Sequence, residues 1–292
     1  MKVLIFGEIL WDIIEGRKHL GGAPLNFAAH TFQCGQESGI ISSLGQDDLG
    51  NEALRLIIDL NVNTDLVQRT DKYDTGTVLV TLDDGQPDYE IKTSVAFDFI
   101  NAEKLNRELI NQYDAFYFGS LIQRNEESQH TLYEVLENFK FDNIFYDVNL
   151  RKDCYSKEII EKSLGYCTML KVNDDEVTVI SDLLYGQCLD FKSFCKEIIM
   201  NYPQIDLVIV TAGKEGCYVF HQGKLLTVPG IPIDVKDTVG AGDSFSAAFL
   251  CAYNKTNDPM KAAAVANRVG AFVASSSGPI PKFPEEVKAL LV

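Results

Sequence analysis

The sequence predicts an α/β fold in which helices cover both faces of a doubly wound, mostly parallel sheet. Short continuous apolar runs bounded by Gly, Asn or Asp recur along the chain, and such runs are typical of strands buried on both faces. Segments with helical spacing of apolar residues lie between them, and this alternation favours a parallel sheet. The predicted strands are 3–6, 115–118, 143–148, 168–172 and 207–210, and the clearest helices are 126–139, 156–167 and 190–199.

One segment, residues 76–100, interrupts this alternation with two strands of alternating polarity and no convincing helix. The stretch "DDGQPD" at 83–88 contains the Gly and Pro that are typical of a hairpin turn. Such a hairpin could extend the edge of the main sheet or form a cover over a site. The chain has no internal repeat and no Ser/Pro-rich linker, so residues 1–292 are expected to form a single domain.

Composition and charge exclude several functional classes. Hydrophobic residues make up 46% of the chain and charged residues 23%, as in globular proteins, and no apolar run is long enough for a membrane helix. The net charge of −16 argues against nucleic-acid binding. The N-terminal apolar stretch carries Glu8 and Asp12, so it is expected to be a strand and not a signal peptide. Seven cysteines without a C-x-x-C pair and four histidines without zinc spacing predict reduced thiols in the cytoplasm and no structural zinc.

Polar residues follow the first predicted strand, where ligands of open parallel sheets bind. The stretch "FGEILWD" lacks the G-x-G-x-x-G of dinucleotide enzymes. Glu8 and Asp12 would repel phosphate but accept hydrogen bonds from the hydroxyls of a neutral polyol; alternatively, both are surface acids. In "LGGAPLNF", Gly21 and Gly22 allow the backbone to approach a ligand closely. Asn26, one helical turn further on, can both donate and accept hydrogen bonds.

The stretch "DTVGAGDSFSAAFL" at 237–250 carries the strongest chemical signal. Its helix is apolar around the whole circumference and should be buried, and Asp243 could cap the free amides. A cap alone does not account for Gly240, Ala241 and Gly242, small residues that can turn consecutive amides outward into an anion nest. No Lys-Ser/Thr follows, so the stretch is not a Walker P-loop. A carboxylate beside an anion nest predicts phosphoryl transfer, with the acid accepting the proton of the attacking hydroxyl.

This stretch resembles the C-terminal signature of the ribokinase-like (PfkB) carbohydrate kinases. Residues 21–50 resemble their N-terminal signature, 171–176 their N-x-x-E motif and 211–216 their nucleotide-side loop. The similarity therefore spans essentially the whole chain. It implies a central, mostly parallel sheet between helices, with a small β lid formed mainly by 76–100 and residues near 12–20.

The resemblance also implies a role for each residue that matches a family motif. Asp243 matches the catalytic base, and Glu176 matches a residue that organises Mg²⁺, acting through water. Asp237 matches a monovalent-cation ligand in members that potassium activates. The other matching positions are the anion hole at Gly240, Ala241 and Gly242, the sugar site at Asp12, Gly22 and Asn26, and the ATP site at Asn173, Thr211, Gly213, Gly216 and Asn267.

Within the family, the stretches "GGAPLNFA", "FGSLIQRNEESQHTL" and "YDVNLR" are most similar to fructokinases. The last of them places Arg151 near the acceptor or phosphate in fructokinase-like and ketodeoxygluconate-kinase-like members; alternatively, Arg151 is a surface residue that caps the following helix. The resemblance implies an ATP-dependent kinase acting on a primary hydroxyl of a monosaccharide, with fructose the expected sugar. The alternatives are a kinase for ketodeoxygluconate, ribose or a nucleoside, and a non-catalytic sugar-binding member. A homodimer formed through the lid is a family-level expectation.

Overall fold

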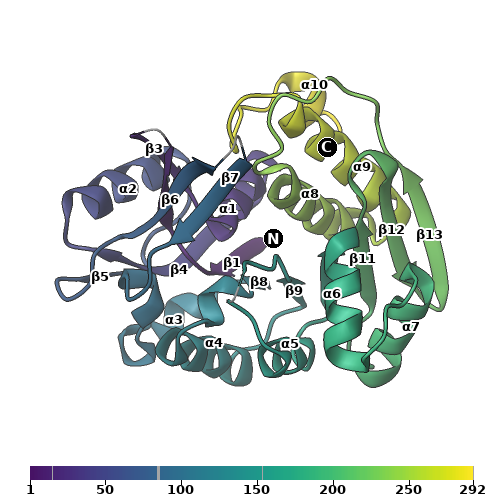
Figure 1. The fold of residues 1–292 in the computed structure, drawn as a ribbon, viewed down its shortest axis with the longest axis horizontal. Helices are drawn as coiled ribbons and strands as arrows, with labels where there is room; N and C mark the ends of the chain where they lie inside the picture. The colour runs from purple at the N-terminus through teal and green to yellow at the C-terminus, as the bar shows by residue number, and fades with distance from the viewer. Residues whose placement is uncertain (15, 84–85, 153, 292) are drawn as a thin grey trace.

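The computed structural model describes residues 1–14, 16–83, 86–152 and 154–291 (Figure 1). Its large sheet confirms the predicted doubly wound, mostly parallel fold: the chain runs from a central first strand to one edge and then returns across the sheet to the other edge. The spatial order is β13 (Lys224–Pro229), β12 (Gly216–His221), β11 (Leu207–Thr211), β10 (Met169–Asn173), β9 (Asn143–Asp147), β8 (Ala115–Gly119), β1 (Lys2–Phe6), β4 (Glu37–Gly45) and β5 (Val67–Thr70). Only the pairings of β12, with β11 and with β13, are antiparallel in the described part of this sheet.

Strand β1 shows why the apolar runs are continuous. Val3 and Ile5 belong to the hydrophobic core on one face of the sheet. Leu4 and Phe6 belong to the core on the other face, because successive side chains of a strand alternate in direction. The first face is covered by α1 (Ala23–Gln33), α2 (Asp48–Asp59), α8 (Ala241–Thr256), α9 (Pro259–Ala274) and α10 (Glu285–Lys288), and the second by α3 (Arg107–Ile110), α4 (Glu126–Asn138), α5 (Lys157–Leu164), α6 (Asp174–Tyr185) and α7 (Phe191–Asn201).

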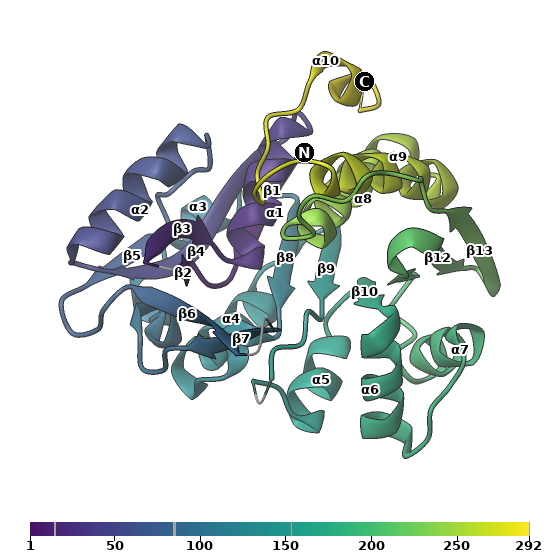
Figure 2. The same cartoon turned by 45° about the horizontal axis from the view of Figure 1, so that its top comes forward.

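A separate four-stranded sheet contains the predicted hairpin. Its order is β3 (Arg17–Gly21), β2 (Leu10–Ile14), β6 (Gly76–Asp83) and β7 (Gln86–Ile91), with β6 and β7 antiparallel. Residues 84–85, in the expected hairpin turn, lie outside the described residues. Because β2 follows β1 after only three residues, this small sheet lies near the carboxyl ends of the central strands (Figure 2).

The segment after this hairpin differs from the expectation that residues 76–100 contain no helix. The strand pairing ends at Ile91, and Ala96–Phe99 forms a 3-10 helix. The cause is a tertiary contact, since Phe97 is fully buried in the core below. Among the described residues, no helix has both the length and the apolar character needed to cross a membrane.

Candidate active site

The first turn of α8 brings together the predicted anion hole and base. Gly240 adopts the left-handed conformation, with φ of 78°, and no side chain caps the helix. The Asp243 Oδ2 atom accepts a hydrogen bond from Asn26 Nδ2 of α1 at 2.8 Å. The interpretation of Asp243 as a helix cap is therefore wrong. The carboxylate is half-buried and directed toward α1, and among the described residues no side chain caps the amides at the start of α8. Of these amides, Ala241 N donates to the Thr238 carbonyl at 3.2 Å.

The protonation of Asp243 is tuned by this position. Burial raises the pKa of the carboxyl to about 6, against the lowering effect of the Asn26 hydrogen bond. The charge of Asp147 raises the pKa further, while Lys171 and Arg151 lower it. A carboxylate with a pKa close to neutral is well matched to accept a proton at physiological pH.

Of the predicted sugar residues, Asn26 contacts this carboxylate, and Gly22 lies one turn earlier at the start of α1. Asn26 N donates to Gly22 O at 3.0 Å, so both residues lie at the start of α1. Gly22 has φ of 110°, and a Cβ atom there would come within 2.5 Å of Glu8 O. A Cβ atom on Gly21 would lie 2.8 Å from Asp12 Oδ2, so the small residue makes room for that carboxylate. Burial raises the pKa of Asp12, and His19 and Arg151 oppose this effect.

Glu8 is an acid of the site and not a surface residue, since only 4% of its surface is exposed. Burial raises its pKa to about 7, Arg151 lowers it and Asp243 raises it. Tyr117 on β8 is buried nearby: burial raises its pKa, and the charges of Asp147, Asp243 and Glu8 raise it further. The position of Glu8 directly after the first predicted strand could assign it to the site from the sequence. Tyr117 could not be assigned in this way, because it lies within an apolar strand.

Arg151 influences the pKa of three acids in the candidate site. It lowers the pKa of Glu8, Asp12 and Asp243, although its own side chain is exposed. Its described hydrogen bond goes to the neighbouring Leu150 carbonyl at 3.2 Å. The following helix, α5, is capped by another residue, Ser156, so the alternative in which Arg151 caps that helix is wrong.

Asn173 and Glu176 form a reciprocal capping box at the start of α6. Asn173 Oδ1 accepts from Glu176 N, and Glu176 Oε2 accepts from Asn173 N, both at 2.8 Å. Glu176 Oε1 also accepts from Leu150 N at 2.8 Å. Both carboxylate oxygens are thus held by amides, an arrangement that fits contact with a cation through water. Within the described ranges, no group of three His, Cys, Asp or Glu side chains could hold a metal ion by itself.

The predicted nucleotide residues lie beside Asn173. Thr211 ends β11 and is paired in register with Asn173 of β10. Gly213 and Gly216 both have positive φ and form the turn into β12, where a side chain on Gly216 would collide with the Val228 carbonyl. Asn267 Nδ2 donates to the carbonyls of Val228 and Pro229, at 3.2 and 3.1 Å, so it joins α9 to β13. A direct contact of Asn267 with ATP stays a prediction.

Asp237 joins two loops behind the anion hole. Its carboxylate accepts from Val239 N at 3.0 Å and from Gly278 N at 3.2 Å. The Asp237 amide donates to Ala274 O at 3.2 Å, so the loop before α8 and the loop after α9 are held together. Its predicted role as a cation ligand stays a prediction.

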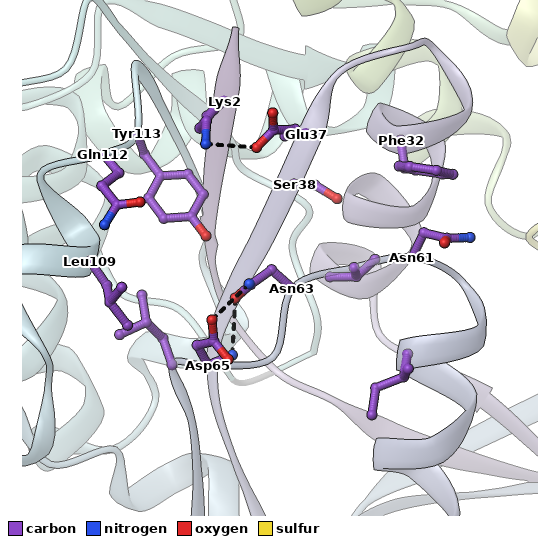
Figure 3. A pocket seen from close by; sticks show the side chains of 13 residues that line it. Lys2, Phe32, Glu37, Ser38, Asn61, Asn63, Asp65, Leu109, Gln112 and Tyr113 are labelled. Atoms are coloured by element: carbon purple, nitrogen blue, oxygen red, sulfur yellow. Dashed lines mark hydrogen bonds and ion pairs between the residues drawn. The ribbon is translucent and has the colours of Figure 1, made fainter.

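The cavity shown in Figure 3 lies at the amino ends of the central strands and not at their carboxyl ends. It has a volume of about 360 Å³ and is lined by residues such as Lys2 and Glu37, at the amino ends of β1 and β4, and by Tyr113 (Figure 3). None of the predicted site residues lines this cavity. Because open α/β sheets bind ligands at their carboxyl edge, the candidate active site is the cluster around Asp243.

Comparison with known proteins assigns the chain to a protein family. Residues 4–286 match the pfkB family carbohydrate kinases, so the chain belongs to this family, whose members are phosphotransferases with an alcohol group as acceptor.

Individual relatives give finer comparisons. The fructokinase of Salmonella typhimurium is 26% identical, and the alignment covers 97% of this chain and 96% of that protein. The crystal structure of the uncharacterized sugar kinase PH1459 from Pyrococcus horikoshii in complex with ATP superposes with a TM-score of 0.86 at 25% identity, over 99% of this chain and 100% of that one. The fructokinase of Vibrio cholerae O395, solved with fructose, ADP and calcium, has a TM-score of 0.84 at 21% identity and covers 100% and 99%, which supports the fold alone.

Proposed function

We propose that this protein is an ATP-dependent kinase that phosphorylates a primary hydroxyl of a neutral monosaccharide, with fructose the preferred sugar. One observation carries the proposal: the half-buried Asp243 carboxylate, held by Asn26, stands at the uncapped start of α8. The similarity to the Salmonella fructokinase and to an ATP complex of a sugar kinase supports the choice of substrates.

The reaction follows from this geometry. An Asp243 oxygen takes the proton of the sugar hydroxyl, the hydroxyl oxygen forms a bond to the γ-phosphorus, and the bond from that phosphorus to the β–γ bridging oxygen breaks to release ADP. The amides at the start of α8 and the helix dipole stabilise the negative charge that the phosphoryl oxygens carry. Asn173 and Glu176 would hold Mg²⁺ through water, and the ion, when bound, neutralises phosphate charge. We also propose K⁺ at Asp237, to be tested by exchange with Na⁺.

The charges around the acceptor favour a neutral sugar over an acidic one. Glu8, Asp12 and Asp243 place three carboxyl groups near the proposed sugar site, and Arg151 acts on all three. Arg124 also acts on Glu8 and Lys171 on Asp243, but these two cations are already paired with Asp98 and Asp147. A sugar acid such as ketodeoxygluconate, or a sugar phosphate, would bring further negative charge to this group of carboxyls. Hydroxyl groups instead supply donors to these carboxylates. The arrangement supports fructose over ketodeoxygluconate.

The substrate is tested by coupled ADP release with fructose, ribose, ketodeoxygluconate, adenosine and fructose phosphates. We expect the highest kcat/KM with fructose and the lowest with the anionic acceptors. A preference for ketodeoxygluconate would reject the argument from charge. ATP binding without turnover of any acceptor would favour a non-catalytic sugar-binding protein instead.

The pH dependence follows from the titration of Asp243. The base accepts a proton only when it is ionised, so kcat/KM should rise as pH rises through about 6 and level off above that pH. A pH profile at saturating ATP measures this acidic limb. Because Glu8 titrates at about 7, the Glu8→Gln variant is the control. It should keep the limb near pH 6, and disappearance of that limb in this variant would assign it to Glu8.

We propose that the four-stranded sheet is a lid over the sugar. Asp12 lies on β2, the central partner of both β3 and β6, so the sheet carries a proposed sugar contact. Exposed Ile14 and Leu79 on the same sheet support the expectation of a homodimer through the lid.

Deletion of residues 83–88 tests this role, because it shortens the hairpin formed by β6 and β7. We expect KM for the sugar to rise more than KM for ATP, since the predicted ATP residues lie on other elements. Equal rises of both KM values would contradict a lid that acts on the sugar.

A further inference from the structure

A buried ion pair lies behind the candidate active site, on β9 and β10, and neither of its residues was among the predicted site residues. Lys171 Nζ of β10 is 3.0 Å from Asp147 Oδ1 of β9. Their side chains are 7% and 1% exposed. Ser246 Oγ of α8 donates to the other carboxylate oxygen of Asp147 at 2.9 Å. The pair thus joins two strands of the sheet to the helix that carries Asp243.

The ammonium group of Lys171 faces the proposed anion hole. A Cβ atom built on Gly242 would lie 3.7 Å from Lys171 Nζ, which is the only described atom within 4 Å of that position outside the two flanking residues and the backbone of α8 itself. Gly242 itself is exposed, so the space beside it is open to a ligand. A group that occupies this space would meet the start of α8 on one side and the ammonium on the other.

Lys171 is expected to be charged in this position, because its ammonium group forms an ion pair with the buried Asp147 carboxylate. A lysine ammonium has three donors, and within the described part of the chain only Asp147 accepts one of them. A buried ion pair is in itself a weak source of stability, because desolvation offsets the attraction. Stability therefore does not explain why the other donors of the Lys171 ammonium group lack a partner among the described residues.

We propose that Lys171 is a catalytic residue whose ammonium group binds the phosphoryl group as it passes from the nucleotide to the sugar. Asp147 and Ser246 are positioning residues that aim this ammonium at the start of α8. The inference rests on the proposed kinase function and extends it, because it adds a cation to the amides as a partner for the phosphoryl oxygens.

Two variants distinguish contact with the phosphoryl group from an effect through Asp243. Lys171 lowers the pKa of Asp243 and Asp147 raises it, so Lys171→Met should move the acidic limb of the pH profile upward. The double variant Lys171→Met/Asp147→Asn removes both charges and should return the limb toward its original pH. We expect kcat to remain about 10²- to 10³-fold low in both variants at pH 8, because neither has the ammonium. Recovery of kcat in the double variant would overturn the proposal.

Nucleotide binding provides a second readout that does not depend on turnover. Calorimetry should show that both variants lose more affinity for ATP than for ADP, by about tenfold, since only ATP carries the γ-phosphoryl group. Lys171→Arg keeps the charge and should retain part of this preference; it also remains informative if the Met variants do not fold. Equal losses for ATP and ADP would overturn the proposal. A wild-type protein that binds ATP but phosphorylates no sugar would instead reject the proposed function.

Discussion

The Asp243→Asn variant is expected to lower kcat by about 10²- to 10⁴-fold, because an amide of the same shape cannot accept the hydroxyl proton. The hydrogen bond from Asn26 can survive, since the new amide oxygen still accepts it. ATP affinity should therefore change little. The measurement is steady-state ADP release with fructose beside calorimetric titration with ATP.

The fold of this variant is checked by thermal unfolding. Its midpoint should not fall, because the substitution removes a half-buried acid whose pKa is already raised by burial. A variant that retains turnover close to wild type would reject Asp243 as the base. The Asn26→Asp variant is a useful companion, because it places a second acid beside Asp243 and should move the acidic limb to higher pH.

The Gly240→Ala variant is expected to lower kcat by about 10²-fold or more by distorting the anion hole. Its backbone is left-handed, and a Cβ atom would come within 2.5 Å of Pro279 O. That oxygen cannot move freely, because it pairs with His30 Nε2 at 2.8 Å. The start of α8 must therefore shift, together with its amides.

A matched control separates backbone strain from damage to the site. Gly186, at the end of α6, is also left-handed, with φ of 68°, but a Cβ atom there would meet nothing within 4 Å. Gly186→Ala should lower stability by about 1–2 kcal/mol and leave kcat unchanged. Similar kcat values for the two variants would contradict the proposed role of the Gly240 turn.

Much of the fold could be predicted because its signals are local. The apolar run of β1 supplies side chains to the cores on both faces of the sheet, so each of its residues indicates a buried strand. The sequence of the α8 start indicated an anion nest because glycine and helix-start preferences act over a few residues. The 3-10 helix at Ala96–Phe99 escaped prediction, since burial of Phe97 in a distant core decides it.

The same limit explains what was missed in the candidate site. Lys171 lies inside one apolar run and Asp147 ends another, and a single polar residue in such a run gives no periodic signal. Their pairing depends on neighbouring strands, and their link to Ser246 depends on how α8 crosses the sheet. Glu8 was ambiguous for a related reason: whether an acid after a strand is buried depends on what covers it.

The hydrogen bond between Asn26 and Asp243 has a consequence for biosynthesis. Its two residues are 217 positions apart, so most of the chain must leave the ribosome before they can meet. Until then, a nascent chain can display the residues proposed to bind the sugar but lacks the proposed base beside them. Contacts of such long sequence separation form late and slowly in folding. Catalytic competence in this protein would therefore be acquired in one of the last steps of its maturation, after the N-terminal strands and helices are in place.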